Sequence, residues 1–118
     1  MPKQKSSEYP SINNSIYATG WGSTVYGGPI SNILYNVKLK IYDKSYCETE
    51  SLISYVKNFD SQICAGELDG SKDTCQGDSG SPIFMLDDVN SQKKFVFVGI
   101  VSYGYKCATQ NNLGFSNF

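Results

Sequence analysis

The ten residues 73–82, which read Asp-Thr-Cys-Gln-Gly-Asp-Ser-Gly-Ser-Pro, constrain the fold of this chain more than any other segment. A plain turn between two strands would account for Gly-Asp-Ser-Gly alone, because these residue types favour tight turns. It does not account for the flanking Cys75, Gln76 and Pro82. Each residue of the segment has a separate mechanical reason to be there, and the segment therefore predicts a loop with a fixed path in a domain of short strands.

Ser79 and its neighbours suit nucleophilic chemistry. A serine hydroxyl is a poor nucleophile at neutral pH unless a base takes its proton, and the oxyanion formed on attack needs backbone N–H donors. Gly77 and Ser79 are placed to supply these donors, and Gly77 has no side chain to block an approaching carbonyl group. The segment resembles the nucleophile loop of the chymotrypsin-like (trypsin-like) serine peptidases. By this resemblance, Asp78 is the buried carboxylate that pairs with the new amino terminus made by zymogen cleavage.

Further segments carry the same resemblance, which covers about residues 15–115. They are Thr-Gly-Trp-Gly at 19–22, Gln-Ile-Cys-Ala-Gly at 62–66 and Ser-Tyr-Gly at 102–104. The resemblance implies that Ser102, Tyr103 and Gly104 pair with the substrate backbone as an added antiparallel strand. It also implies that Gly104 and Gly114 leave the walls of the specificity pocket bare. For Gly104, a simple turn glycine is the alternative interpretation.

Asp73 lies six residues before Ser79, where resemblance to the trypsin branch puts the base of the primary specificity pocket. A carboxylate there would pair with a substrate Arg or Lys through a charge-assisted contact. The alternative is a solvated acid in a charged loop. After Gly114 the match frays, since Phe115 and Ser116 replace a small aliphatic residue and a tyrosine.

The chain contains no histidine. In a Ser-His-Asp mechanism the imidazole is the general base and then the general acid, and no other side chain titrates near neutrality without large environmental help. In the family that this chain resembles, the histidine and the aspartate lie in the first half of the catalytic domain. The resemblance therefore implies the C-terminal half of a peptidase domain, whose partner is a missing N-terminal barrel that carries both residues.

Four cysteines allow three pairings, and the sequence alone leaves all three open. Their spacings include no C-x-x-C pair, which argues against a zinc site. The resemblance implies the pairs Cys47–Cys64 and Cys75–Cys107, and two disulfides imply an oxidising compartment. We therefore expect a secreted protein whose signal peptide lies upstream of residue 1. A further disulfide of many relatives is replaced here by two apolar residues, Ile16 and Met85.

Short strands separated by turns follow one another along the chain. Strands are predicted at residues 16–21, 36–41, 81–86 and 95–103, with a polar hairpin connection at 87–94. Helical character is confined to residues 45–58. Residues 1–14 form a polar connector with two prolines, and Asn13 begins an Asn-Asn-Ser glycosylation sequon. Many short strands with Gly-rich turns predict a sandwich or a barrel.

Composition excludes several other classes of function. The net charge is −1 and basic residues are scattered, so no nucleic-acid partner is predicted. The longest apolar run, residues 95–101, is far too short to span a membrane. No metal or cofactor is expected.

The resemblance therefore predicts an all-β fold: the second antiparallel β-barrel of a chymotrypsin-like domain, residues 15–118, with one short helix and truncated at both ends. The expected function of the intact protein is endopeptidase cleavage of protein or peptide substrates after Arg or Lys. Protein protease inhibitors are possible further partners. This chain alone is expected to be inactive. Two alternatives stay open: a non-catalytic homologue that acts as a binding or regulatory protein, and a truncated gene with no product of its own.

Overall fold

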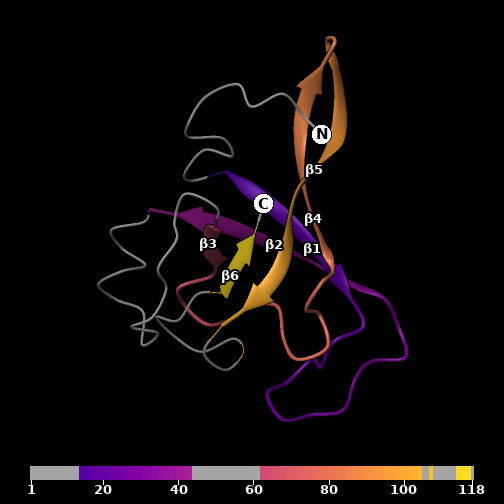
Figure 1. Cartoon of the computed structure of the whole chain (residues 1–118), viewed down its shortest axis with the longest axis vertical. Coiled ribbons are helices and arrows are strands. Elements are labelled where there is room, and N and C mark those ends of the chain that lie inside the picture. The colour runs from indigo at the N-terminus through magenta and orange to yellow at the C-terminus, as the bar shows by residue number, and fades with distance from the viewer. Residues whose placement is uncertain (1–13, 44–61, 105–106, 108–113, 118) are drawn as a thin grey trace.

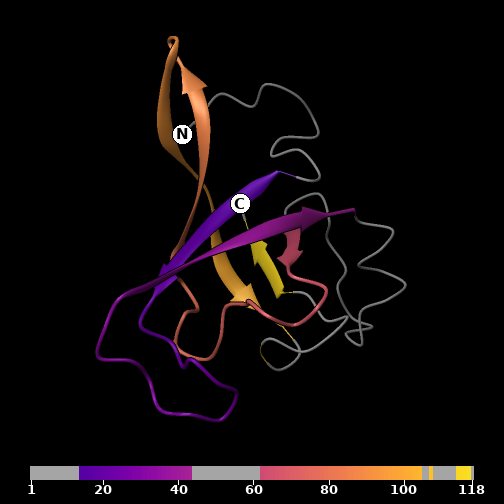
Figure 2. The ribbon, with the colours of Figure 1, turned by 180° about the vertical axis from the view of Figure 1, so that it is seen from behind.

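Six antiparallel strands close into one barrel in the computed structural model, which describes residues 14–43, 62–104, 107 and 114–117. The strands are β1 (Ser15–Gly20), β2 (Tyr35–Tyr42), β3 (Gln62–Gly66), β4 (Pro82–Val89), β5 (Gln92–Tyr103) and β6 (Gly114–Asn117). Their order around the barrel is β1-β2-β3-β6-β5-β4, and every pairing is antiparallel. Figure 1 and Figure 2 show the barrel from opposite sides. The expected all-β barrel is confirmed.

Alternate side chains of the strands fill the barrel interior. In β2 the predicted alternation holds, because Leu39 and Ile41 are buried and Val37 packs against the core. In β1 and β4 the core residues also alternate, whereas β3 is buried at four consecutive positions and the core residues of β5, Val98 and Val101, are three positions apart. Together these five strands give the cluster Ile16, Ala18, Leu39, Ile41, Ile63, Ala65, Ile83, Met85, Val98 and Val101. Period-two burial thus selects the inward face of β1, β2 and β4.

The β4–β5 hairpin is longer than the sequence predicts. Residues 87–94 were expected to form a loop, yet β4 continues to Val89 and β5 begins at Gln92. Asn90 and Ser91 alone make the turn, both with positive φ (51° and 63°), which is the geometry of the two-residue turns that match strand twist. Opposite charges on facing positions stabilise the polar strands, including a 3.5 Å contact between Lys93 Nζ and Asp88 Oδ2. The hairpin projects beyond the rest of the barrel (Figure 1).

β6 completes the barrel by pairing with both β3 and β5. The sequence predicted no strand at Gly114–Asn117, because four residues carry too short a pattern to show a period. The predicted helix at 45–58, the connector up to residue 13 and its sequon residue Asn13 lie outside the described residues. Within the described part of the chain, no helix has the length and apolar character needed to cross a membrane.

Candidate functional site

The loop between β3 and β4 carries Ser79 and is fixed at both sides by backbone hydrogen bonds. Asp78 N donates to Cys75 O (3.0 Å) and Ser81 N donates to Asp78 O (2.9 Å), so the segment forms two successive turns. Gly80 N donates to Val101 O, and Val101 N donates to Ser81 O, both at 2.9 Å. These two bonds hold the Ser79 turn against β5.

Ser79 is exposed at the edge of an open groove of about 210 Å³. The groove is lined by the Ser79 loop, by the end of β5 and by one residue of the β1–β2 loop: Tyr26, Thr74, Cys75, Gln76, Ser79, Val101, Ser102, Tyr103, Gly104 and Cys107. Three predicted substrate-binding residues, Ser102, Tyr103 and Gly104, thus come together with the predicted nucleophile. Gly114, the first residue of β6, is not among the lining residues, and its backbone pairs with Ala65 of β3.

A β-bulge brings Ser102 to the serine hydroxyl. The β5–β6 register shifts between Val101 and Tyr103, which leaves Ser102 out of the ladder. The Ser79 hydroxyl donates to the Ser102 carbonyl oxygen at 3.3 Å. Bulges re-aim groups beside active sites, and here the bulge turns part of β5 towards the loop.

The backbone amides of Gly77 and Ser79 have no acceptor among the residues that the structure describes. Neither N–H donates a hydrogen bond to any other described residue. Gly77 has φ of +96°, a conformation that residues with a Cβ rarely adopt, and an added Cβ would lie 3.1 Å from the Cα of Gly22. Within the described residues, these two amides are therefore not committed to another hydrogen bond.

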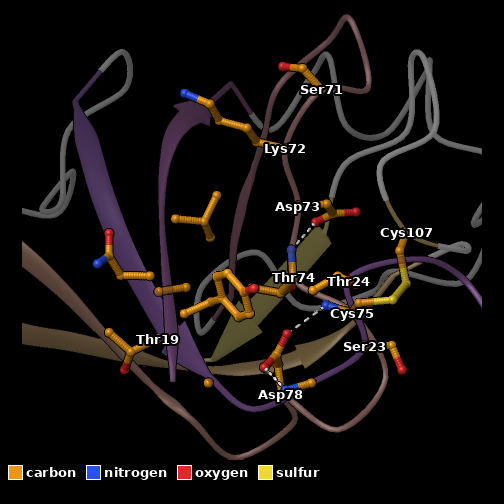
Figure 3. Close-up of a pocket in the computed structure, with 16 residues that line it drawn as sticks. Thr19, Ser23, Thr24, Ser71, Lys72, Asp73, Thr74, Cys75, Asp78 and Cys107 are labelled. Atoms are coloured by element: carbon orange, nitrogen blue, oxygen red, sulfur yellow. Dashed lines mark hydrogen bonds between the residues drawn. A yellow bond between two sulfur atoms is a disulfide. The ribbon is translucent and has the colours of Figure 1, made fainter. Parts of the chain in front are cut away.

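Asp78 points away from the groove into a second cavity of about 220 Å³ (Figure 3). Its Oδ1 accepts from Gly22 N at 2.8 Å and its Oδ2 accepts from Cys75 N at 2.9 Å. The carboxyl group packs so closely on Gly20 and Gly22 that a Cβ on either glycine would overlap it. The Thr-Gly-Trp-Gly segment thus forms the cradle for this carboxylate. Among the described residues, no lysine or arginine forms an ion pair with it.

Asp73 is half-buried and lines the cavity of Asp78, not the groove of Ser79. Its Oδ1 accepts from Thr74 N at 2.8 Å (Figure 3). Thr74 is the next residue and lines both cavities, so Asp73 lies one residue beyond the groove wall. In the same loop, hydrogen bonds from the side chain and the backbone of Ser71 lower the pKa of the exposed Asp69.

The disulfide Cys75–Cys107 ties the Ser79 loop to the segment after β5. Its Cα atoms are 5.2 Å apart, and this predicted pairing is confirmed. Cys64 is buried and also disulfide-bonded, but Cys47 lies outside the described residues, so their pairing stays a prediction. The described residues contain no group of three or more His, Cys, Asp or Glu side chains that could hold a metal ion.

Two residues of the site were not anticipated from the sequence. Gln76 accepts two bonds from the β1–β2 loop, one from Ser23 N to its carbonyl oxygen (2.8 Å) and one from Gly27 N to its Oε1 (3.1 Å). Tyr26, in that loop, lines the groove beside Ser79. The Gly27-Gly28 pair signals a turn, yet no local pattern tells where such a turn docks.

Comparisons with known proteins agree with this geometry. The family model described as Trypsin matches residues 2–117, beyond the part of the chain that the motifs covered. The chain is 40% identical over 95 residues to the proclotting enzyme of Tachypleus tridentatus, 38% over 94 residues to trypsin-1 of Astacus astacus, and 35% over 101 residues to transmembrane protease serine 11G of Rattus norvegicus. These matches cover 78%, 80% and 86% of this chain but only 24%, 37% and 23% of the relatives. The chain thus spans a quarter to about a third of their length.

Proposed function

The chain belongs to the trypsin family of serine proteases, and from this premise we propose that it carries the nucleophile and the substrate groove of a serine endopeptidase. One observation carries the proposal: the exposed Ser79 hydroxyl lies at a groove, and within the described residues the backbone N–H groups of Gly77 and Ser79 donate no hydrogen bond. Such donors stabilise the oxyanion of an acyl-transfer transition state.

The proposed reaction is acyl transfer from a peptide bond. Ser79 Oγ attacks the carbonyl carbon, the negative charge moves to the carbonyl oxygen facing the two amides, and the C–N bond breaks as the amine leaves with a proton. Water then hydrolyses the ester to release the acid and regenerate the hydroxyl. Because the 118 residues include no histidine, the general base and its aspartate have to come from another part of the protein.

We propose that this part is a first barrel, connected through residues 1–14, and that it packs on an aromatic face of the present barrel. Tyr17, Phe84 and Phe95 of three neighbouring strands line an apolar groove of about 420 Å³. Phe95 is 65% exposed, although its ring meets that of Tyr17 edge to face at 5.7 Å. Exposed apolar patches of this kind are typical of protein interfaces. Residues 15–118 are then the second barrel of one catalytic domain.

Asp73 supports cleavage after Arg or Lys. Its half-buried carboxylate lies one residue beyond Thr74 in the groove wall, within the same short loop as Ser79. A long basic side chain that passes Thr74 would reach it, and an Arg would bind as a fork while a Lys would bind as a point charge. A neutral side chain would form no charge-assisted contact with this carboxylate. Gly114 remains our candidate for the opposite wall of this pocket.

Asp78 supports activation by a cleaved amino terminus. Its carboxylate lines a cavity with room for a chain end and, within the described residues, accepts hydrogen bonds from two backbone amides. An α-ammonium group there would add a charge-assisted hydrogen bond. The disulfide Cys75–Cys107 favours an oxidising compartment, and we propose that the protein is secreted. Protein protease inhibitors that present a substrate-like segment would use the same groove.

The test uses the intact protein with its upstream part, after activation. A phosphonate probe should label Ser79 rapidly, and peptide libraries should be cleaved after Arg and Lys. Asp73→Ser should lower kcat/KM for Arg substrates by about two orders of magnitude or more while Ser79 stays reactive to a small uncharged acylating agent. The 118-residue chain alone should show no fast labelling. An intact protein that binds peptides without labelling would favour a non-catalytic homologue, and equal cleavage after Phe and Arg would remove Asp73 from the specificity pocket.

A further inference from the structure

The loop between β1 and β2 is fastened to the residue that precedes the proposed oxyanion donor. Gln76 accepts from Ser23 N through its backbone oxygen and from Gly27 N through its side-chain oxygen, at 2.8 and 3.1 Å. Two bonds to one residue, one of them to its side chain, fix both the position and the orientation of this loop relative to Gly77.

The docked loop is also ordered internally. Gly28 N donates to Val25 O at 3.0 Å, with Gly27 at φ +76° between them, which is a type II turn with glycine at its third position. The buried Ser23 hydroxyl donates to Gly28 O at 2.7 Å and closes the turn on its base. Tyr26 occupies the second position of this turn. Its backbone is therefore held in place although 56% of the residue surface is exposed.

Tyr26 and Gln76 line the groove of Ser79, and so do Ser102 and Tyr103 at the end of β5 and the following Gly104. Under the proposed function, the substrate residues before the scissile bond add to the end of β5 as a strand. The part of the lining formed by Gln76 and Tyr26 is then left for the residue that follows the scissile bond. A tyrosine offers a large, amphipathic contact surface at a low cost in conformational entropy.

We propose that Tyr26 is a specificity-determining residue that favours a large apolar or aromatic substrate side chain directly after the scissile bond. This inference rests on the proposed peptidase function. It adds a second point of selection to the one assigned to Asp73, on a loop that the Gln76 bonds hold beside the catalytic serine.

The experiment compares two peptides in the intact, activated protein, identical except for Phe or Ala after the scissile Arg. The unmodified protein should prefer the Phe peptide in kcat/KM, and Tyr26→Ala should reduce this preference about tenfold, the scale of one apolar contact. Tyr26→Phe keeps the ring and should retain most of the preference. Val25→Ala is the matched control, because Val25 is 61% exposed in the same turn and does not line the groove.

The inference is overturned if Tyr26→Ala leaves the preference for the Phe peptide unchanged, or if Val25→Ala reduces this preference equally. It is also overturned if Tyr26→Ala lowers kcat/KM for both peptides by the same factor. A second readout separates this outcome from failure of the proposed function. In the Ser79→Ala form of the intact protein, calorimetric binding of both uncleaved peptides should show the same contrast between Tyr26 and Tyr26→Ala. If the unmodified protein cleaves neither peptide, the peptidase proposal fails, and the binding contrast alone decides the role of Tyr26.

Discussion

Gly22 and Asp78 should be strongly coupled in their effects on stability. Gly22 N donates to Asp78 Oδ1 at 2.8 Å, and the three atoms nearest to an added Cβ on Gly22 all belong to the Asp78 carboxyl group. Gly22 is not in the left-handed region, so its backbone conformation suits alanine. In Gly22→Ala the methyl group must therefore displace the carboxylate, and the bonds from Gly22 and Cys75 weaken together.

The size of the effect follows from these two bonds. A hydrogen bond to a charged group contributes about 1.5–3 kcal/mol to stability, and for a half-buried carboxylate the lower end applies. Gly22→Ala and Asp78→Ala should each lower the free energy of unfolding by about 3 kcal/mol. In the double variant the new methyl group meets no carboxylate. The double variant should therefore lower the free energy of unfolding by about 3 kcal/mol and not by the sum of about 6 kcal/mol, which corresponds to a coupling energy of about 3 kcal/mol.

Urea unfolding followed by the fluorescence of Trp21, the single tryptophan of the chain, measures all four corners of this cycle. Gly27→Ala serves as the control. No atom lies within 4 Å of its added Cβ, but its φ of +76° disfavours alanine, and its cost of about 1 kcal/mol should be additive with Asp78→Ala. Costs of Gly22→Ala and Asp78→Ala that add to within about 0.5 kcal/mol would refute the cradle as described here.

Three further outcomes are expected. Ile16 falls opposite Met85 when the β1–β4 register is continued by one residue. The double variant Ile16→Cys with Met85→Cys should therefore form a disulfide, measured as the loss of two titratable thiols. Two free thiols in the folded variant would contradict the register. The pKa of the Asp69 carboxyl, measured by NMR titration, should lie below its ordinary value, and Ser71→Ala should raise this pKa because it removes the side-chain hydrogen bond that is the largest cause of the shift. Since the folded-state pKa is lowered, the ionised Asp69 stabilises the fold at pH values above the unfolded-state pKa. This contribution to stability is lost as the pH falls through the folded-state pKa. Ser91→Gly should raise the free energy of unfolding by about 0.5–1 kcal/mol, because glycine adopts φ of 63° without strain, whereas a loss of stability would show that the serine side chain matters more than the backbone.

Local patterns predicted those parts of the fold that local physics determines. Leu39 and Ile41 point inward because a strand with one buried face alternates, and that alternation is visible in six residues. The Asn90–Ser91 turn was missed because the polar residues on both sides of it resemble a loop. Their strand conformation comes from cross-strand pairing, which a single strand does not reveal. β6 was missed for the same reason, since it is defined by its two partners.

The candidate site divides in a similar way. The motif around Ser79 predicted a turn that exposes this serine next to a glycine with positive φ, and both features depend on neighbouring residues in the chain; the roles of nucleophile and oxyanion donors stay predictions. The docking of Tyr26 beside Ser79 depends on bonds between segments about 50 residues apart, such as Gly27 N to Gln76 Oε1. Nor does the six-residue spacing between Asp73 and Ser79 reveal which of two adjacent cavities the aspartate lines.

Those two cavities share a wall, and this limits how independently the proposed activation and substrate sites can act. Thr74, Cys75 and Cys107 line both of them, and the disulfide makes two of these three residues move together. Because closely packed interiors transmit strain, we expect a group that enters the Asp78 cavity to change the shape of the groove at Ser79. Coupling free energies between sites are reciprocal, so a substrate that orders the groove favours the filled state of the other cavity by the same amount. We therefore expect a variant that displaces the Asp78 carboxylate to weaken substrate binding, measured as a higher KM, even though Asp78 itself does not line the groove.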